Sequence, residues 1–465
     1  MELTQLALAE AAKLIEQRHI SPVELTEAYL ARIERINPRL NCFITLTAEA
    51  ALEQAKTAQD AIRRGEYRGA LHGIPVALKD VFETRDVRTT AGSRILAEYV
   101  PESDCTVIQR LNAAGAILLG KLNMYEWAMK ANNYNPYFGT CYNPWDLARS
   151  PGGSSGGAGA ALAADLCCGA LGSDSGGSIR IPAAFCGIVG LKPTYGRVSK
   201  QGVIPLSWSL DHVGVMARRV CDVALLFQAI AGYDSDDPYS INIPTSNYLA
   251  SLDEGIRGWR IAVAYETFFL GYKKNNAEVV QAIEQAIDTC RHLGASVRNV
   301  ELPRASEAGY MNSLLLTSEA AAYHRKRMQE QPQDFGTDTL GSLESGASFS
   351  AVDYALARRE QVVFRRQLER LLANHDLLLT PTTPDAAPLY DEPDASKVLR
   401  PSATSYTSPF NLTGLPALSL PCGFTRAGLP IGLQIIARPW AEAALLRAGQ
   451  AYEQATRWHL RRPAL

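Results

Sequence analysis

The segment 150–190 holds the residues of this 465-residue chain that are best suited to chemistry. Glycine, serine and alanine dominate it, and Gly153-Ser154-Ser155-Gly156-Gly157 matches the Gly-x-Ser-x-Gly pattern around the nucleophilic serine of many hydrolases. A flexible linker could have this composition, but here apolar residues are interleaved with the glycines. Glycines in such a segment favour tight turns and close backbone approach, as around a catalytic serine.

A serine nucleophile needs a base, and histidine is the usual one. The chain has seven histidines, of which His212 is the best candidate for the base of a Ser-His-Asp triad. However, the Gly-x-Ser-x-Gly turn requires a strand directly before it, and residues 146–151 do not have the pattern of a core strand. A structural role for His212 fits the sequence better, so we expect a base of another type.

Lys79 is the alternative base, because it ends the apolar run Ile74–Leu78. At its ordinary pKa of about 10.4, a lysine is neutral for only about 0.04% of the time at pH 7. Burial disfavours the ammonium form, and a pKa of roughly 7–8 would remove about 3.5–4.6 kcal/mol of that deficit. The competing interpretation is a surface lysine that pairs with the neighbouring Asp80.

The elements that must position these residues follow from the hydrophobic pattern. Residues 1–65 are expected to be helical, and the helix that begins at the capping box Ser21-Pro22-Val23-Glu24 is expected to end at Asn37-Pro38. Short apolar runs suit buried strands, and they occur at 74–78, 116–119, 185–189, 260–264, 376–379, 417–420 and 431–436. Helical stretches separate several of these runs, namely 276–293, 351–373 and 441–456. This alternation predicts an α/β fold: one compact domain with a large mixed central β-sheet covered by helices on both faces.

The overall composition excludes several classes of function. A net charge of −2 implies no basic face, so we expect no direct nucleic-acid partner and no membrane partner. No run reaches about 18 apolar residues, and the start of the chain lacks a signal-peptide pattern. Nine scattered cysteines without a Cys-x-x-Cys pair predict reduced thiols and a cytoplasmic protein.

No cofactor is expected either. No spacing of histidines and carboxylates indicates a metal site. The run Gly115–Lys121 nearly matches a phosphate-binding loop, but Leu122 stands where a serine or threonine would be needed for Mg²⁺.

Several longer motifs, in order along nearly the whole chain, resemble the amidase signature family. They are Gly73–Asp80, Ser150–Gly157, Gly172–Pro182, Gly190–Gly196 and Asn411–Pro416. The resemblance implies the amidase signature fold and hydrolysis of a carboxylic amide C–N bond by a Ser–cis-Ser–Lys triad. It also divides the single domain 1–465 into an N-terminal helical segment (1–65), a signature catalytic core (66–200) and a remainder with the substrate-pocket loops (201–465).

The same resemblance implies the role of each site residue. Lys79 would be the base, Ser154 the bridging serine on a cis peptide bond, and Ser178 the nucleophile that forms an acyl-enzyme. Supporting groups would be Ser155, Asp174 and Arg180. The oxyanion would be held by backbone N–H groups, each typically worth about 2.7–4 kcal/mol. These N–H groups belong to Ser175, Gly176, Gly177 and Ser178.

The substrate is less well defined by the sequence. By resemblance the segment Met124–Met129 lines the acyl pocket, with Tyr125, Ala128 and Met129 as substrate-binding residues, although core packing explains these side chains equally well. Aryl amides, carbamates (urethanes) and short esters all fit such a pocket. We therefore expect a small-molecule amide-type substrate and a monomer or homodimer.

The family also includes the A subunit of the glutamyl-tRNA(Gln)/aspartyl-tRNA(Asn) amidotransferase, which releases ammonia from glutamine within a complex. That protein reads glutamine with an arginine after its Phe-Gly segment and with an acid before its Asn-Leu-x-Gly-Leu-Pro motif. Here Phe335–Leu343 contains no basic residue, and Thr404 lies near the expected position of the acid. A free-standing amidase is therefore the main interpretation, the glutaminase-type A subunit is the alternative, and a non-catalytic scaffold that retains the fold is a third.

Overall fold

The computed structural model of the protein describes residues 2–265, 269–271, 275–302, 304–390 and 402–465. One mixed sheet of eleven strands runs through these described ranges, in the order β1-β3-β2-β4-β6-β5-β10-β11-β9-β7-β8. The pairs β2–β3, β2–β4, β7–β8 and β7–β9 are parallel, and the other neighbours are antiparallel. The strands are β1 (Phe43–Leu46), β2 (Pro75–Lys79), β3 (Ile117–Leu122), β4 (Gly169–Asp174), β5 (Val189–Lys192), β6 (His212–Ala217), β7 (Arg260–Ala264), β8 (Ser296–Val300), β9 (Leu377–Pro381), β10 (Ala417–Phe424) and β11 (Pro430–Ile436).

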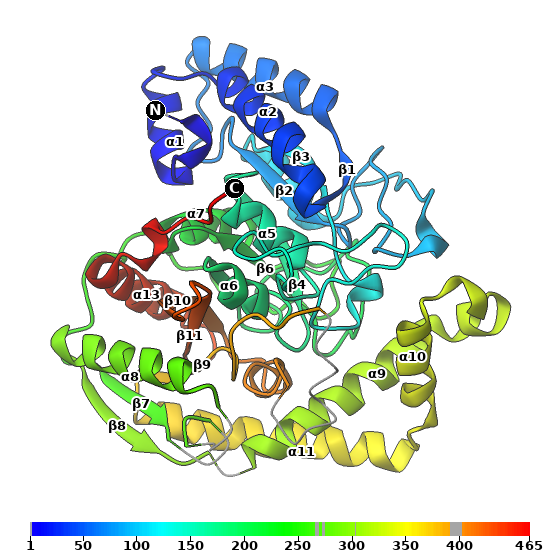
Figure 1. The fold of residues 1–465 in the computed structure, drawn as a ribbon, viewed down its shortest axis with the longest axis vertical. Helices are drawn as coiled ribbons and strands as arrows, with labels where there is room; N and C mark the ends of the chain where they lie inside the picture. Colours follow the sequence, from blue (N-terminus) through cyan, green and yellow to red (C-terminus); the bar gives the residue numbers. More distant parts are fainter. Residues whose placement is uncertain (1, 266–268, 272–274, 303, 391–401) are drawn as a thin grey trace.

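The α-helices form the layers around this sheet. In Figure 1, α1–α3 lie at the end of the molecule that holds β1–β3, and α9–α11 form an arm at the lower right. The helices are α1 (Leu8–Glu16), α2 (Pro22–Leu40), α3 (Ala48–Arg63), α4 (Thr106–Ala113), α5 (Gly156–Ala163), α6 (Arg180–Cys186), α7 (Val220–Ile230), α8 (Ala277–His292), α9 (Ala305–Glu330), α10 (Thr337–Ser348), α11 (Ala351–Ala373), α12 (Ser408–Leu412) and α13 (Glu442–Thr456).

Strand β4 shows that helices cover both faces of the sheet. Gly169 and Gly172 point to opposite faces, because side chains alternate along a strand. A Cβ on Gly169 would meet Leu226 of α7, whereas a Cβ on Gly172 would meet Ser155 and Ile179, which precede α5 and α6. The sheet therefore lies between two helical layers, which confirms the expected α/β fold.

Helix α2 differs from its expected length. Its capping box at Ser21 is formed, but the helix continues past Pro38 to Leu40. A proline in the last turn removes only one backbone donor, and the turn closes when Asn41, in the left-handed conformation, donates its N–H to the carbonyl of Asn37 at 2.7 Å. The predicted end at Asn37-Pro38 was therefore wrong by less than one turn.

The segment 150–190 folds as two helices around one strand. Helix α5 begins directly after Ser155, β4 ends at Asp174, and α6 begins at Arg180. The predicted strand at 185–189 is wrong, because its first residues belong to α6. Gly187, with φ 69°, ends that helix, and β5 begins at Val189.

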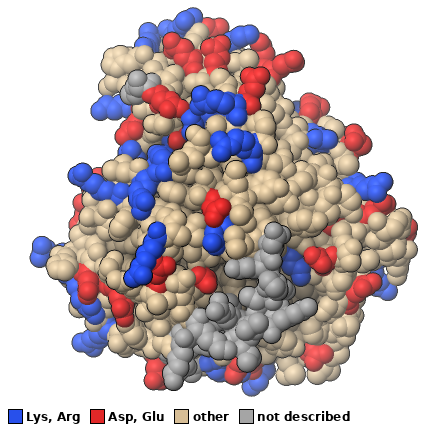
Figure 2. Space-filling view, viewed as in Figure 1, with Lys and Arg blue, Asp and Glu red and all other residues tan. Residues whose placement is uncertain are grey.

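The surface shows no large region of one charge on the side seen in Figure 2. There Lys and Arg are interspersed with Asp and Glu, as the net charge of −2 predicts. None of the helices in the described ranges combines the length and the hydropathy needed to span a bilayer.

Candidate active site

Lys79 ends β2 inside the protein. Its side chain is fully buried, and its Nζ lies 2.7 Å from the Oγ of Ser154 and 2.9 Å from the Oγ of Ser173. β2 and β4 are parallel neighbours, so their carboxyl ends meet at one edge and bring Lys79 next to Ser173. The predicted base and the predicted bridging serine are therefore in direct contact.

Asp80 is not the partner of Lys79. It is also fully buried, but it lies 3.6 Å from the Nζ of Lys121 on β3 and accepts a hydrogen bond from the backbone N–H of Thr90 at 2.9 Å. Successive residues at a strand end point in opposite directions, which separates the two side chains. The interpretation of Lys79 as a surface lysine paired with Asp80 was wrong.

Burial lowers the pKa of Lys79 to about 7, because desolvation disfavours the ammonium form. The carboxylates of Asp211 and Asp174 act in the opposite direction, but they do not cancel the effect of burial. Near neutral pH a large fraction of Lys79 is therefore the free amine. A free amine 2.7 Å from a hydroxyl oxygen can accept its proton.

Ser154 lies in a closely packed stretch of the chain. The Gly153–Ser154 peptide bond is cis, and the carbonyl of Ser154 accepts a hydrogen bond from the N–H of Tyr125 at 3.3 Å. A Cβ on Gly153 would come within 1.9 Å of the backbone oxygen of Asn132, so only glycine fits at that position. The close packing fixes the direction in which the Ser154 hydroxyl meets Lys79.

Ser178 follows β4 in the turn that leads into α6. Its carbonyl accepts a hydrogen bond from the N–H of Ser155 at 3.2 Å, while the hydroxyl of Ser155 donates to the carbonyl of Ser173 at 3.3 Å. Ser155 thus joins the segment that carries Ser154 to the turn that carries Ser178. At 8% exposure, Ser178 is the most exposed of the three predicted triad residues.

Asp174 and Arg180 form a fully buried ion pair at the base of this turn. Arg180 donates to Asp174 through both Nε and Nη2 at 3.0 Å, and the amide of Asn411 donates to the Asp174 carboxylate at 2.8 Å. Burial alone would raise the pKa of Asp174, but the Arg180 guanidinium and the amide hold it well below its usual range. These predicted supporting residues are therefore structural anchors rather than exposed polar groups.

The turn 175–177 is held from three sides. The N–H of Gly177 donates to the Asp174 carboxylate at 2.7 Å. The carbonyls of the two residues before it accept hydrogen bonds from Thr407 (to Gly176, 2.6 Å) and Asn312 (to Ser175, 3.2 Å). One of the four predicted oxyanion donors is thus already engaged inside the turn, and the oxyanion role of the others stays a prediction.

His212 does not contact either serine. Its Nδ1 lies 2.6 Å from the carbonyl oxygen of Leu210 and 3.2 Å from that of Asp174, and its Nε2 has no hydrogen-bond partner among the described residues. Burial, with the positive charge of Lys192 as a further cause, lowers its pKa well below the usual value. The geometry therefore favours Lys79 over His212 as the base.

The predicted substrate-binding residues lie next to Ser154. Tyr125, Ala128 and Met129 are all buried in the described structure, and the N–H of Tyr125 donates to the Ser154 carbonyl. Glu126, which lies between them in the sequence, accepts a hydrogen bond from the N–H of Gly336 at 2.9 Å. This contact brings the start of the segment Phe335–Leu343 next to the predicted substrate-binding residues. Contact of these side chains with substrate stays a prediction.

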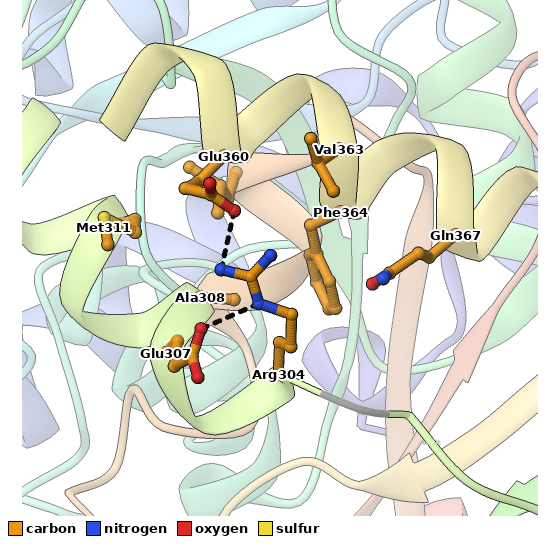
Figure 3. A pocket seen from close by; sticks show the side chains of 9 residues that line it. Arg304, Glu307, Ala308, Met311, Glu360, Val363, Phe364 and Gln367 are labelled. Carbon is orange, nitrogen blue, oxygen red and sulfur yellow. Dashed lines mark hydrogen bonds and ion pairs between the residues drawn. The ribbon is translucent and has the colours of Figure 1, made fainter. Parts of the chain in front are cut away.

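Two hollows occur around α9. A cavity of about 850 Å³ between α9, α10 and α11 is lined by Trp208, Glu319 and Tyr354 among others, and Glu319 accepts a hydrogen bond from the Ser207 hydroxyl. The second, shown in Figure 3, is a pocket of about 10 Å³ where Arg304 pairs with two glutamates. The ion pairs fill this second pocket, so only the first has room for a small molecule.

Four residues near the site were not predicted. Ser173 binds Lys79, Thr407 and Asn411 hold the turn, and Asp211 accepts a hydrogen bond from the hydroxyl of Ser175. Asn411 lies in a motif that had been recognised, so its role could have been inferred. The same holds for Ser173, which lies in the motif Gly172–Pro182, whereas Thr407 carries no comparable signal.

Comparisons with known proteins agree with this geometry. A family model described as Amidase matches residues 24–446. The A subunit of the glutamyl-tRNA(Gln) amidotransferase of Moorella thermoacetica is 42% identical over 488 residues, which cover 100% of this chain and 99% of that protein. The relatives thus favour the alternative interpretation, a glutaminase-type A subunit, over a free-standing amidase.

Solved structures extend the likeness to the whole fold. One, described as an unexpected vestigial protein complex that reveals the evolutionary origins of an s-triazine catabolic enzyme, has a TM-score of 0.93, 34% identity and coverage of 99% of this chain and 100% of that chain. The A subunit of the glutamyl-tRNA(Gln) amidotransferase of Thermotoga maritima has a TM-score of 0.84 and 31% identity, and covers 98% and 95%. Together with the family match, these similarities show that the chain belongs to the amidase signature family and is an amide-hydrolysing enzyme.

Proposed function

We propose that Lys79, Ser154 and Ser178 form a catalytic triad that cleaves a carboxylic amide through a seryl acyl-enzyme. The observation that carries this proposal is the 2.7 Å contact between the Nζ of Lys79 and the Oγ of Ser154 in a fully buried site. A pKa of about 7 gives the lysine the protonation state that a base needs. The hydrogen bond from Ser155 to Ser178 supports the placement of the third member.

The reaction follows from this arrangement. The free amine of Lys79 accepts a proton from Ser154, which accepts one from Ser178 as the Ser178 Oγ attacks the amide carbon. N–H groups of the turn 175–178 stabilise the oxyanion of the tetrahedral intermediate. Ser154 then returns the proton to the leaving nitrogen, because an amine leaves poorly unless it is protonated. Water, activated along the same path, releases the acid and frees Ser178.

For the physiological role, we propose the glutaminase-type A subunit of an amidotransferase. The support is the 42% identity to such a protein over nearly the full length of both chains. In this role the chain works together with other subunits and releases ammonia from glutamine, rather than acting alone. A cytoplasmic location agrees with nine cysteines that are all free, eight of them buried.

A second candidate, an amidase for uncharged amides, carbamates or esters, is supported by one specific observation. The stretch Phe335–Leu343 contains no basic residue, and Thr404 replaces the expected acid. In the structure the hydroxyl of Thr404 lies 3.0 Å from that of Ser402. A binding site for the charged groups of free glutamine would therefore need other residues.

The two candidates are separated by assays of the purified chain alone and of the chain co-purified with the other amidotransferase subunits. Ammonia release from glutamine only in the complex supports the amidotransferase role. Cleavage of a chromogenic anilide by the chain alone, without glutaminase activity in the complex, supports the second candidate.

The triad is tested independently of the substrate. Lys79→Ala and Ser178→Ala should abolish turnover, and a fluorophosphonate should label Ser178 in the wild type. Lys326→Ala and Ser345→Ala, at exposed positions on α9 and α10, serve as matched controls and should behave as wild type. Retained turnover in Lys79→Ala, or labelling of a different serine, would rule the triad out.

A further inference from the structure

Asp211 is the residue directly before β6, and it lies opposite the turn that carries the proposed nucleophile. β4 and β6 are antiparallel, and their register places Asp174 opposite His212. The next residues outward, Ser175 and Asp211, therefore face each other, and the Ser175 hydroxyl donates to the Asp211 carboxylate at 2.5 Å. Asp211 thus holds the first residue of the turn 175–178.

Both oxygens of the Asp211 carboxylate accept hydrogen bonds. Its second oxygen accepts hydrogen bonds from the N–H groups of Leu206 at 2.9 Å and Ser207 at 3.0 Å. Burial raises the pKa of Asp211, and the positive charge of Lys200 and the three donors act against that rise. These donors satisfy both carboxylate oxygens, which offsets part of the cost of burying the charge.

The other titratable groups around Asp211 come from five places: the loop between β5 and β6, the loop after α7, the helix α9, and the strands β4 and β6. Lys200, in the loop between β5 and β6, donates to the hydroxyl of Tyr195 at 3.0 Å and to the carbonyl of Trp208 at 2.7 Å. Asp237, which follows α7, and Glu319, on α9, act on Lys200. On the strands, burial lowers the pKa of His212 well below its usual value, and Asp174 is paired with Arg180.

Asp211 and Lys79 meet the same stretch of chain: Lys79 contacts the hydroxyl of Ser173 at 2.9 Å, and Asp211 accepts the hydrogen bond of Ser175, two residues further on. The negative charges of Asp211 and Asp174 both raise the pKa of Lys79 against the effect of burial. Asp174 pairs directly with the adjacent Arg180 guanidinium, whose positive charge opposes that of the carboxylate. The hydrogen bonds that Asp211 accepts within the described residues come instead from neutral donors.

We propose that Asp211 is a positioning residue of the hydrolytic reaction: it anchors Ser175 at the head of the nucleophile turn, and its negative charge sets the pH range over which Lys79 is a free amine. The inference rests on the proposed function, because it takes Lys79 as the base. The hydrogen bond with Ser175 and the negative charge that acts on Lys79 both come from the Asp211 carboxylate, and different substitutions can separate them.

The test is the pH profile of kcat/KM for the wild type and three variants, since the acidic limb of that profile reports the base of the free enzyme. Asp211→Asn removes the charge, so the acidic limb should move to lower pH by about 1 unit. Its plateau kcat should fall, because Lys79 becomes a weaker base and the hydrogen bond with Ser175 is no longer strengthened by the carboxylate charge. Ser175→Ala removes only the hydrogen bond, so kcat should fall while the limb stays in place.

Asp211→Glu keeps the charge and serves as the conservative variant. Its limb should stay within the error of the wild type, and it carries the test together with Ser175→Ala if Asp211→Asn does not fold. An unmoved limb in Asp211→Asn, or a limb displaced to lower pH in Asp211→Glu or Ser175→Ala, would overturn the inference. If Lys79→Ala itself retains turnover, the proposed function fails instead, which keeps the two failures distinct.

Discussion

Lys79 and Lys121 are both buried, on neighbouring strands, but their side chains have different interaction partners. The Nζ of Lys121 has the carboxylate of Asp80 at 3.6 Å and the hydroxyl of Thr89 at 2.7 Å, whereas that of Lys79 meets the two hydroxyls of Ser154 and Ser173. Burial lowers the pKa of both lysines. Only Lys79 has a hydroxyl partner that leads toward a proposed nucleophile, and that difference in partner makes it the candidate base.

The pH dependence of activity follows from the state of Lys79. A base must be unprotonated, so turnover should rise as the pH increases through about 7, the pKa of Lys79. Well below that pH, kcat/KM should fall about tenfold for each pH unit. Initial rates measured from pH 5 to 9 check this, and an acidic limb centred below pH 5 would contradict it.

The burial of Lys79 also lowers the free energy of unfolding at pH values where the unfolded chain would protonate this side chain. The folded state holds its pKa near 7, below the ordinary value, so between these values the unfolded chain binds more protons and wild-type stability rises with pH. Lys79→Met should therefore be more stable than the wild type, most clearly at pH 6. The gain should shrink by roughly 1 kcal/mol per pH unit above pH 7. Urea unfolding at pH 6 and 9 measures this, with exposed Lys326→Met as the control; a less stable Lys79→Met would count against it.

Two adjacent glycines give a matched test of the nucleophile turn. Gly177 has φ 136°, and a Cβ there would lie 2.2 Å from the Oγ1 of Thr407, whereas a Cβ on Gly176 would meet its nearest atom, on Asn312, at 3.5 Å. Gly177→Ala should therefore lower the melting temperature by several degrees, and Gly176→Ala should change it little. Thermal unfolding followed by circular dichroism compares them. Equal melting temperatures for the two variants would show that the turn tolerates a side chain at both positions.

At the level of elements, one buried guanidinium joins four segments of the fold. Arg180 begins α6 and binds Asp174 at the end of β4, Asn411 in α12 and Gln434 on β11. These hydrogen bonds run from α6 to three other elements of the fold. The turn 175–178 is therefore anchored to both halves of the chain, which keeps its backbone donors in one orientation.

Loss of this guanidinium should be severe. Arg180→Met leaves the Asp174 carboxylate buried without its partner, which typically costs about 3–5 kcal/mol. Because the folded protein holds the pKa of Asp174 low, the pair contributes stability above the ordinary carboxyl pKa and loses it as the pH falls through the folded value. The difference between wild type and variant should thus be largest near pH 7 and smaller below pH 4.

Denaturant unfolding at pH 7 and at pH 3 measures this difference. Arg366→Met removes an exposed pair with Glu369 on α11 and is the control, with an expected loss of about 0–1 kcal/mol. A loss in Arg180→Met no larger than in this control would show that the buried pair does not anchor the turn.

At the level of the whole molecule, the sheet crosses the proposed division at residue 200. β5, in the segment 66–200, pairs with β6 and β10, which both belong to the segment 201–465. The division into a core and a remainder stays a prediction, but the strand pairing means that the two segments share one central sheet. Neither segment can leave the other without exposing paired strands of the central sheet.

Unfolding should therefore be a single event. Denaturant curves followed by far-ultraviolet circular dichroism and by tryptophan fluorescence should coincide, because Trp127 lies before residue 200 and Trp259 and Trp440 lie after it. Two separated transitions would show that the segments fold as independent units.

The local pattern of the sequence pointed to Lys79 and Ser154, whereas the role of Ser178 was implied by the resemblance to the amidase signature family. The apolar run before Lys79, the glycine-flanked Ser154 and the motif that contains Ser178 are all visible in the chain itself. Several strands were also predictable, since β2, β3, β7, β9, β10 and β11 each contain a short apolar run. β4 and β6 escaped prediction, because glycines and polar residues interrupt their hydrophobic pattern.

Only the tertiary structure decided which partners these residues meet. Lys79 and Ser173 are 94 positions apart, and Asp174 and Asn411 are 237 apart. Hydrophobic periodicity specifies that a strand is buried, but it carries no information about which strand lies next to it. The pairing of β2 with β4 placed Lys79 against hydroxyls, and the pairing of β4 with β6 placed Asp211 against Ser175. Strand order, not local composition, therefore made this lysine a candidate base.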